Sequence, residues 1–245
     1  MPMTKDLYVI IPAAGRGLRM GEGETKLFLP VNGVPVLGRT LHAFSSYARK
    51  KEGMIRMHIV IVTSSELIER VKNLVEENQF TFVESIVLGG ETRQDSVQNG
   101  AIKLKELHSP PTKEDVVFIH DGARCLVDFN TLDRCFSDTA KYGVCVAAVP
   151  VKDTIKEVVE KGQSKVKETL DRGKLHAIQT PQAFLWEILE KSLKNAAENE
   201  ITGTDDTSLA EAMGYPVFLT PGSYQNIKIT TPEDILIAEA FLRAD

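Results

Sequence analysis

A glycine-rich turn near the start of the chain combines residue types that bind phosphate. Gly15 and Gly17 follow an apolar run, and Arg16, Arg19 and Lys26 place positive charges in and after the turn. Glycine lets the backbone approach a ligand closely, and consecutive backbone N–H groups in such a turn form a concavity that attracts anions. Fixed cations suit a polyphosphate better than a neutral ligand. A Gly-x-Gly after a strand is common, so the turn favours a nucleotide phosphate site without establishing one.

Two common nucleotide-binding motifs do not fit this turn. The dinucleotide fingerprint has a third glycine where this chain has Met20. The Walker motif ends in Gly-Lys followed by Ser or Thr, which the turn lacks. What remains is Ala-Gly-x-Gly-x-Arg-Met over residues 14–20 with Lys26 downstream. This pattern resembles the loop over which sugar-phosphate nucleotidyltransferases bind an NTP.

Strands that alternate with helices are needed to position these residues. Apolar and β-branched runs predict strands over residues 7–11, 57–62, 80–88, 116–119 and 144–149. Helices are expected over residues 35–47, after a capping box at 63–66, and over 93–107 and 129–142. Repeated strand–helix units of this kind predict an α/β fold with a mostly parallel, doubly wound sheet.

Further polar motifs follow the predicted strands where they end. Gly89 and Gly90 follow the third strand, and His120 and Asp121 follow the fourth. Ligands of such sheets bind at the carboxyl ends of the strands, so we expect these groups to surround one ligand. Asp121 can meet a ribose or Mg²⁺. His120 is expected to pack and form hydrogen bonds, and Arg93 to pair with a carboxylate or support its loop.

The chain changes character after residue 151. Residues 152–174 carry many charges, and Ile155, Val158 and Val166 alternate around a predicted turn. This pattern indicates a projecting hairpin arm, which we expect to pack on a second copy of the chain; an ordinary solvated hairpin is the alternative. Beyond the arm we expect a helix after Pro181, capping by the aspartates at 205 and 206, strands over residues 217–220 and 226–229, and a final helix from residue 232.

Composition excludes several classes of function. The chain has 245 residues, 42% of them hydrophobic, which is enough for one domain with a large core. A formal net charge of −5 argues against general nucleic-acid binding but allows a local basic pocket. No apolar run approaches a membrane span, and the start of the chain lacks a signal-like apolar segment. Three cysteines form neither a disulfide framework nor a zinc pattern, so we expect a cytoplasmic protein.

Motifs along nearly the whole chain carry a more specific resemblance. They occur in the order seen in the 2-C-methyl-D-erythritol 4-phosphate cytidylyltransferase family, at residues 13–20, Lys26, and residues 89–97, 120–124, 149–154, 179–182 and 226–234. This family belongs to the non-mevalonate isoprenoid pathway. The resemblance implies a single Rossmann-like nucleotidyltransferase domain over residues 1–245, with residues 152–175 as a protruding dimerisation arm of a homodimer.

The resemblance also implies the reaction and its cofactor. CMP is transferred from CTP to 2-C-methyl-D-erythritol 4-phosphate, and pyrophosphate leaves. Mg²⁺, or another divalent cation, is expected to be bound mainly by the CTP phosphates, with Asp121 as the protein contact. The attacking phosphate is already anionic, so the reaction needs no strong base. Catalysis would then rest on positioning and on electrostatic stabilisation.

Individual roles follow from the same resemblance. Arg19 and Lys26 are expected to stabilise the transition state, and Arg172 and Lys228 to position the acceptor for attack; Arg16 is a secondary candidate. Gly89, Gly90 and Ser96 are expected to form the cytosine pocket. The expected CTP contacts are Ala13, Ala14, Gly15, Gly17, Gly89, Gly90, Ser96, Asp121 and Gly122. The expected acceptor contacts are Arg124, Thr154, Arg172, Thr180 and Lys228.

Three positions depart from the usual family pattern, and two other functions stay open. Thr25 and Cys125 stand where proline is common, and Gly122 where alanine is frequent. These changes affect loop rigidity and remove no reacting group. A cytidylyltransferase for another polyol phosphate, such as ribitol 5-phosphate, would share the CTP half of the site. A non-catalytic nucleotide-binding module is disfavoured because both Arg19 and Lys26 are present.

Overall fold

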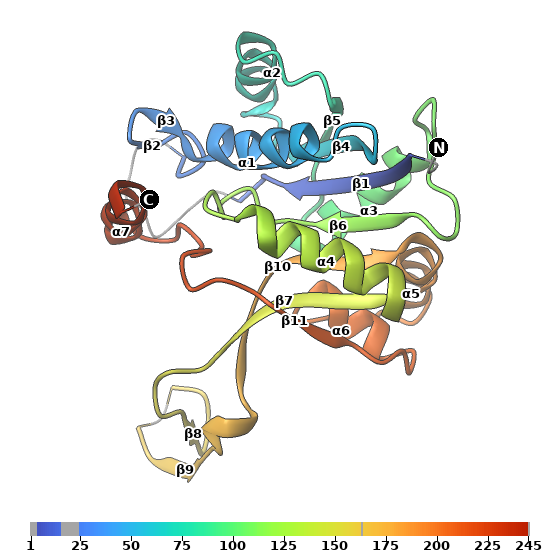
Figure 1. The fold of residues 1–245 in the computed structure, drawn as a ribbon. Coiled ribbons are helices and arrows are strands. Elements are labelled where there is room, and N and C mark those ends of the chain that lie inside the picture. Colours follow the sequence, from blue (N-terminus) through green and yellow to red (C-terminus); the bar gives the residue numbers. More distant parts are fainter. Residues whose placement is uncertain (1–3, 16–24, 163, 245) are drawn as a thin grey trace.

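A mixed sheet of seven strands forms the centre of the protein (Figure 1). The computed structural model describes residues 4–15, 25–162 and 164–244. The strand order is β11-β7-β10-β6-β1-β4-β5. The strands are β1 (Lys5–Pro12), β4 (Ile55–Thr63), β5 (Val83–Leu88), β6 (Val116–Ile119), β7 (Val144–Pro150), β10 (His176–Leu185) and β11 (Phe218–Pro221). All neighbours pair in parallel except β10, which is antiparallel to both β6 and β7. The predicted mostly parallel sheet is therefore confirmed.

The alternation of side chains along the strands creates two hydrophobic cores. In β1, Leu7, Val9 and Ile11 face one core, whereas Tyr8 and Ile10 face the other. One core is covered by α1 (Val36–Lys50), α2 (Ile68–Glu77), α4 (Phe129–Tyr142) and α7 (Pro232–Ala244). The other is covered by α3 (Arg93–Lys105), α5 (Trp186–Glu198) and α6 (Asp206–Glu211). Figure 1 shows α1 and α4 on the near side of the sheet. The sheet is thus doubly wound, as predicted.

The antiparallel strand β10 differs from the expected course of the chain. The chain does not turn into a helix directly after Pro181; β10 continues to Leu185, and α5 begins at Trp186. The Thr180–Pro181 peptide bond is cis. Pairing with β7 is interrupted between Ile178 and Gln182. Proline has no N–H to donate to a ladder, so this irregularity is where a strand can accommodate it.

Two other local predictions are wrong. Residues 63–66 form no capping box, because Thr63 ends β4 and its hydroxyl donates to the carbonyl of Ala13 (3.1 Å). The helix after it, α2, has no side-chain cap. Residues 226–229 form no strand; the segment is tied to the β6–α4 connection at Ile229, whose N–H donates to the carbonyl of Ala123 (2.9 Å). In both places the hydrogen-bond donor finds its acceptor in a neighbouring loop and not within the expected helix or strand.

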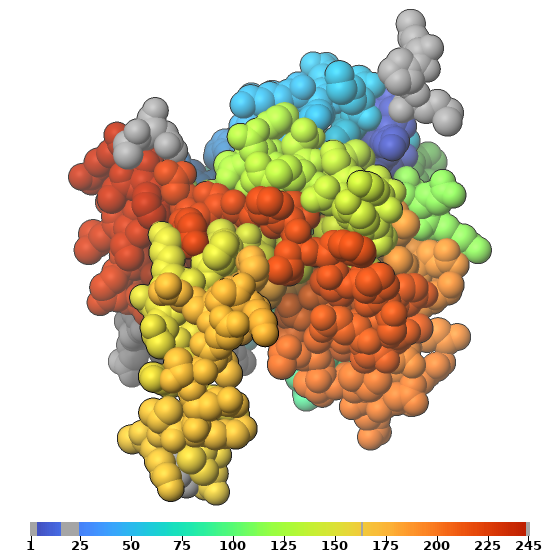
Figure 2. Space-filling model, turned by 60° about the horizontal axis from the view of Figure 1, so that its bottom comes forward, coloured from blue at the N-terminus to red at the C-terminus, as the bar shows by residue number. Residues whose placement is uncertain are grey.

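Two short hairpins complete the fold. One joins β2 (Pro30–Val31) and β3 (Val34–Pro35) ahead of α1. The other, between β7 and β10, contains β8 (Lys156–Val158) and β9 (Val166–Thr169), followed by a 3-10 turn at Arg172–Lys174. This second hairpin is the predicted arm, and it projects from the body of the molecule (Figures 1 and 2). In the described ranges, no helix is both long and apolar enough to cross a membrane.

Candidate active site

A cavity of about 210 Å³ lies at the carboxyl ends of the parallel strands. It is bordered by the end of β1, by the β5–α3 connection, by the residues after β6, and by two lysines from elsewhere in the chain. Among the predicted site residues, the cavity is lined by Ala13, Ala14, Gly15, Lys26, Gly90, Ser96, Asp121, Gly122 and Lys228. The predicted convergence of the motifs at one edge of the sheet is therefore what the structure shows.

A second cavity of about 390 Å³ adjoins the first. Its walls include Arg124, Thr180 and Lys228, three of the predicted acceptor residues. Three residues line both cavities, namely Arg93, Asp121 and Lys228. Two ligands bound side by side would meet at this junction.

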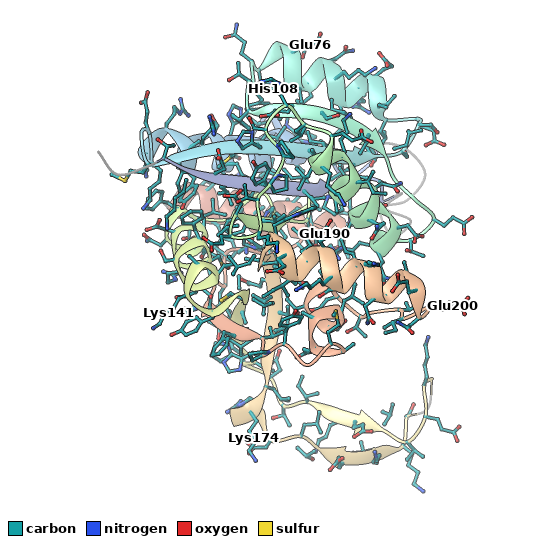
Figure 3. All side chains as sticks on the ribbon, turned by 90° about the vertical axis from the view of Figure 1, so that its right-hand side faces the viewer. Glu76, His108, Lys141, Lys174, Glu190 and Glu200 are labelled. Atoms are coloured by element: carbon teal, nitrogen blue, oxygen red, sulfur yellow. The ribbon has the colours of Figure 1, made fainter. Side chains whose placement is uncertain are left out.

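Of the other predicted residues, Gly89, Thr154 and Arg172 are described by the structure and line neither cavity. Arg16, Gly17 and Arg19 lie outside the described residues. Thr154 is exposed at the start of the arm. Arg172 lies after β9, where its Nη1 donates to the carbonyl of Lys152 (2.6 Å), and it lines neither cavity of its own chain. Lys174 of the same turn, labelled in Figure 3, lies with the arm below the body of the molecule.

Lys26 is carried by a firmly anchored segment. Its neighbours Leu27 and Phe28 are buried in the core. The carbonyl of Leu27 accepts a hydrogen bond from the N–H of Leu37 in α1 (2.9 Å), and the N–H of Phe28 donates to the carbonyl of Thr25 (2.9 Å). The backbone beneath Lys26 is therefore fixed by contacts that do not involve its own side chain.

The predicted cytosine pocket is built around close backbone approach. A Cβ atom at Gly89 would lie 2.8 Å from the hydroxyl of Ser96, and one at Gly90 only 2.2 Å from the Cβ of Asp95. The N–H of Gly90 donates to the Ser96 hydroxyl (3.2 Å), which itself donates to the carbonyl of Thr92 (3.0 Å). Both positions therefore require glycine, and Ser96 fixes the shape of the cavity wall.

Asp121 is surrounded by cations. Its Oδ2 lies 2.7 Å from Nζ of Lys228 and 3.9 Å from Nε of Arg124, and its Oδ1 lies 3.2 Å from Nε of Arg93. Burial favours the neutral acid, but Arg93 and Lys228 outweigh burial and lower the pKa of Asp121. Asp121 is consequently a carboxylate that is held ionised at the junction of the two cavities.

A chain of hydrogen bonds through Thr180 and His120 holds the backbone of Asp121. The backbone N–H of Asp121 donates to the Thr180 hydroxyl (3.1 Å). The hydroxyl in turn donates its own proton to Nδ1 of His120 (3.0 Å). Nε2 of His120 then donates to the carbonyl of Arg124 (3.0 Å). Burial lowers the pKa of His120 to about 4. His120 is thus a neutral hydrogen-bonding residue, in agreement with the sequence-based expectation.

The segment that carries Lys228 is held by buried polar residues that the sequence did not single out. Asn226 donates from Nδ2 to the carbonyl of Thr180 (2.9 Å), and its own carbonyl accepts from Arg124 (2.7 Å). Gln179 donates to the carbonyl of Ser223 (2.7 Å). The only sequence signal for these roles was the position of both residues within motif segments. Their effect is to fix the backbone leading to Lys228.

Asp121 is the carboxylate at the site that a metal ion could contact. In the part of the chain that the structure describes, no group of three or more His, Cys, Asp or Glu side chains is arranged to hold a metal ion. Mg²⁺ usually takes one or two carboxylates together with substrate phosphates and water. Asp121 is ionised, borders the first cavity, and has further lone pairs beside its ion pairs. This donor set fits Mg²⁺ brought in by a nucleotide.

Two buried groups beside the junction, His120 and Asp206, are expected to change the stability of the protein in opposite directions as the pH falls. Burial raises the pKa of Asp206 to about 6, although Arg93 acts in the other direction. The unfolded chain takes up the His120 proton near its ordinary pKa of 6.5, above the folded value, so His120 removes stability as the pH falls from 6.5 to about 4. Asp206 takes up its proton in the folded state first, so it adds stability between pH 6 and its ordinary pKa of 3.8.

We therefore predict that single substitutions will separate these effects. In metal-free protein, a fall in pH from 7 to 4.5 should cost Asp206→Asn more unfolding free energy than it costs the wild type, by about 2–3 kcal/mol. The same fall in pH should cost His120→Asn less than the wild type, by a similar amount. Urea unfolding of the wild type and both variants at the two pH values measures the difference. Identical pH dependence in all three proteins would contradict this prediction.

The fold and the site together define a nucleotidyltransferase, with a doubly wound sheet and a cation-lined cavity at its strand ends. The chain belongs to the IspD family, 2-C-methyl-D-erythritol 4-phosphate cytidylyltransferase, whose family model matches residues 7–244. Similar curated proteins carry that name. One from Syntrophus aciditrophicus is 39% identical over 99% of this chain and 98% of its own length. One from Bacillus mycoides is 41% identical over 96% of both chains.

Solved structures agree with this assignment. A 4-diphosphocytidyl-2C-methyl-D-erythritol synthase from Anaerococcus prevotii has a TM-score of 0.77 and 29% identity, covering 98% of this chain and 99% of its own. A 2-C-methyl-D-erythritol 4-phosphate cytidylyltransferase from Thermus thermophilus has a TM-score of 0.74 and 30% identity, covering 96% and 98%. The resemblance noted in the sequence is therefore confirmed at the level of family and fold.

Proposed function

We propose that this enzyme transfers CMP from CTP to 2-C-methyl-D-erythritol 4-phosphate, giving 4-diphosphocytidyl-2-C-methyl-D-erythritol and pyrophosphate in the non-mevalonate isoprenoid pathway. The family assignment supports this reaction. The structural observation that carries it is the meeting of two cavities at Arg93, Asp121 and Lys228. The first cavity takes CTP, and the second takes the acceptor phosphate.

The reaction is a displacement at phosphorus that needs no proton transfer. An oxygen of the acceptor phosphate attacks the α-phosphorus of CTP, the new P–O bond forms, and the bond to the bridging oxygen of pyrophosphate breaks. Lys26 and Arg19 hold the CTP phosphates and the charge that develops, and Lys228 orients the acceptor. Asp121, together with the CTP phosphates, would hold Mg²⁺ when it is bound, and the ion would supply further positive charge against the phosphates.

The base is selected at the β5–α3 connection. Backbone groups of Gly89 and Gly90, together with the Ser96 hydroxyl, hydrogen-bond to the cytosine edge. Their positions are fixed by the close packing described above. A uracil would leave some of these groups unpaired in a restricted cavity, which is the physical basis for choosing CTP over UTP.

Pyrophosphate release distinguishes the candidate functions. With CTP and Mg²⁺, we expect release with 2-C-methyl-D-erythritol 4-phosphate and little with ribitol 5-phosphate. Preference for ribitol 5-phosphate would replace the proposed acceptor. Absence of release with either acceptor, with CTP still bound, would favour a non-catalytic nucleotide-binding module.

The arm supports a shared site in a homodimer. Residues 152–175 form a dimerisation arm of a single nucleotidyltransferase domain in this proposal. Val158 and Val166 on the arm are exposed, so the arm has apolar surface to bury against another chain. Arg172 lies away from the cavities of its own chain. Arg172 and Thr154 therefore contact the acceptor bound by the partner subunit.

Mixing inactive variants tests the shared site. Arg172→Ala should raise the acceptor KM and lower turnover at low acceptor about 30-fold, while CTP binding is retained. Subunits carrying Arg172→Ala, when exchanged with subunits carrying Lys26→Ala, should form hybrid dimers with one intact site. Random exchange should then restore about a quarter of wild-type activity. A mixture no more active than its parents, or a fully active monomer, would contradict the shared site.

We assign the enzyme to the cytoplasm. Cys125, Cys135 and Cys145 are all buried and free, and burial raises the pKa of each thiol. Buried free thiols without disulfides are typical of proteins from a reducing compartment, which supports this assignment.

A further inference from the structure

Arg93 lies where the two cavities meet, and the reaction proposed above gives it no task. It is the first residue of α3, and a capping box fixes the turn that carries it. In that box the N–H of Thr92 donates to the Asp95 carboxylate (2.9 Å), and the N–H of Asp95 donates to the Thr92 hydroxyl (3.1 Å). The Arg93 side chain is 36% exposed and borders both cavities. A ligand that spans the cavities therefore passes its guanidinium.

Asp206 holds this guanidinium from the protein side. Nη1 of Arg93 lies 2.7 Å from Oδ2 of Asp206, which is only 3% exposed. That oxygen makes no well-aligned hydrogen bond to any residue that the structure describes, so the ion pair with Arg93 compensates its burial. Asp206 is itself fixed, because its backbone N–H donates to the side chain of Gln182 (2.8 Å). Asp205, rather than Asp206, provides the cap of α6.

The charges at the junction suit an anion. Arg93, Lys228 and Arg124 lie close to Asp121, and Asp206 adds a second carboxylate on the buried side. The contacts of Arg93 to the two carboxylates involve Nε and Nη1. A guanidinium carries five N–H donors in a fixed plane, so donors remain for a phosphate in the cavities.

We infer that Arg93 is a further phosphate-binding residue of this site and that Asp206 is the positioning residue that orients its guanidinium. The inference rests on the proposed function, in which the acceptor phosphate and the α-phosphate of CTP meet at this junction. Arg93 shields both phosphates from Asp121 and carries part of the charge that develops around phosphorus. Asp206 contacts no substrate and acts only through Arg93.

Four variants separate this role from that of a structural ion pair between α3 and α6. Arg93→Gln removes the cation, Asp206→Asn removes its support, and the double variant leaves a neutral pair of similar shape. Lys105→Gln is the matched control, because it breaks an exposed ion pair between Lys105 of α3 and Glu190 of α5 (2.6 Å) away from the cavities. For each protein we would measure kcat, both KM values, the melting temperature and the binding of inorganic phosphate, which stands in for the acceptor phosphate.

Arg93→Gln should lower kcat about 100-fold and weaken the binding of inorganic phosphate about tenfold. Asp206→Asn should lower kcat about tenfold with little change in the CTP KM, because the charge stays but loses its orientation. The double variant should recover the melting temperature lost in Arg93→Gln, since no buried carboxylate is left unpaired, and yet keep the low kcat. Lys105→Gln should match the wild type.

Opposite results overturn the inference. Recovery of kcat in the double variant would show that the pair is only structural, and an equal loss in Lys105→Gln would show a general disturbance of α3. The proposed function can fail separately. Wild-type protein that releases no pyrophosphate with the methylerythritol acceptor, but binds inorganic phosphate more tightly than Arg93→Gln does, would disprove the function and support the role of Arg93. Equal binding of inorganic phosphate by the two proteins would overturn the role of Arg93.

Discussion

Replacement of Lys26 by alanine is expected to lower kcat about 1,000-fold without unfolding the protein, because removal of one preorganised charge at a reacting centre has effects of this order. Lys26 borders the first cavity, where the phosphates of CTP are proposed to bind. Negative charge on the phosphate oxygens increases as the acceptor oxygen approaches, so the lysine is worth more in the transition state than in the ground state. The expected effect is therefore on kcat more than on the CTP KM.

The anchoring of this segment makes the result interpretable. Core packing here comes from Leu27 and Phe28, and backbone hydrogen bonds of these two residues hold the segment in place. The melting temperature of Lys26→Ala should thus equal that of the wild type. Lys26→Arg should recover part of the lost rate, and Lys191→Ala, at an exposed α5 position paired with Glu187, should behave as wild type. Normal turnover by Lys26→Ala would remove this lysine from the catalytic residues.

The fold was predictable wherever a pattern reflects burial of one element against the sheet. The strand around Val9 and the helix around Phe44 follow from periodicity alone, since each side chain reaches a core. β10 was harder, because Pro181 signals a break in the chain while neighbouring strands pair with β10 on both sides. Residues 226–229 resemble a strand but pair with no strand. They are held by local backbone hydrogen bonds at Asn226 and Ile227, by the bond from Ile229 to Ala123, and by the side chain of Arg124.

The site was predictable to the extent that it lies at strand ends. Gly90 and Asp121 follow parallel strands, so topology alone brings them together. The ion pair of Arg93 with Asp206 could not be foreseen, because it joins the first turns of two helices whose distance is set by the whole sheet. Two adjacent aspartates can both cap a helix, and only the structure shows that Asp205 does so and leaves Asp206 for Arg93. Arg172 presents a different problem, since its proposed partner is on another chain.

Gly90→Ala is expected to damage the CTP site through the backbone. A Cβ at this position would lie 2.2 Å from the Cβ of Asp95 and 3.3 Å from its backbone, and a Cβ cannot move aside by rotation. The first turn of α3 must therefore shift, which strains the capping box of Asp95 and separates Gly90 from Ser96. We expect a loss of about 2–3 kcal/mol in the free energy of unfolding and a CTP affinity about 100-fold weaker.

Gly122→Ala provides the matched control, because Gly122 lines the same cavity. Its added Cβ would lie 3.3 Å from side-chain carbons of Ile11 and Leu37 and from the backbone oxygen of Pro12, so each neighbour needs to move only slightly. We expect it to cost less than about 1 kcal/mol and to change CTP affinity less than about threefold. Urea unfolding and calorimetric titration with CTP compare the two variants. If Gly90→Ala and Gly122→Ala proved equally mild, the β5–α3 connection would be too pliable to discriminate bases by fixed backbone groups, and selection of cytosine would have to come from the Ser96 side chain alone.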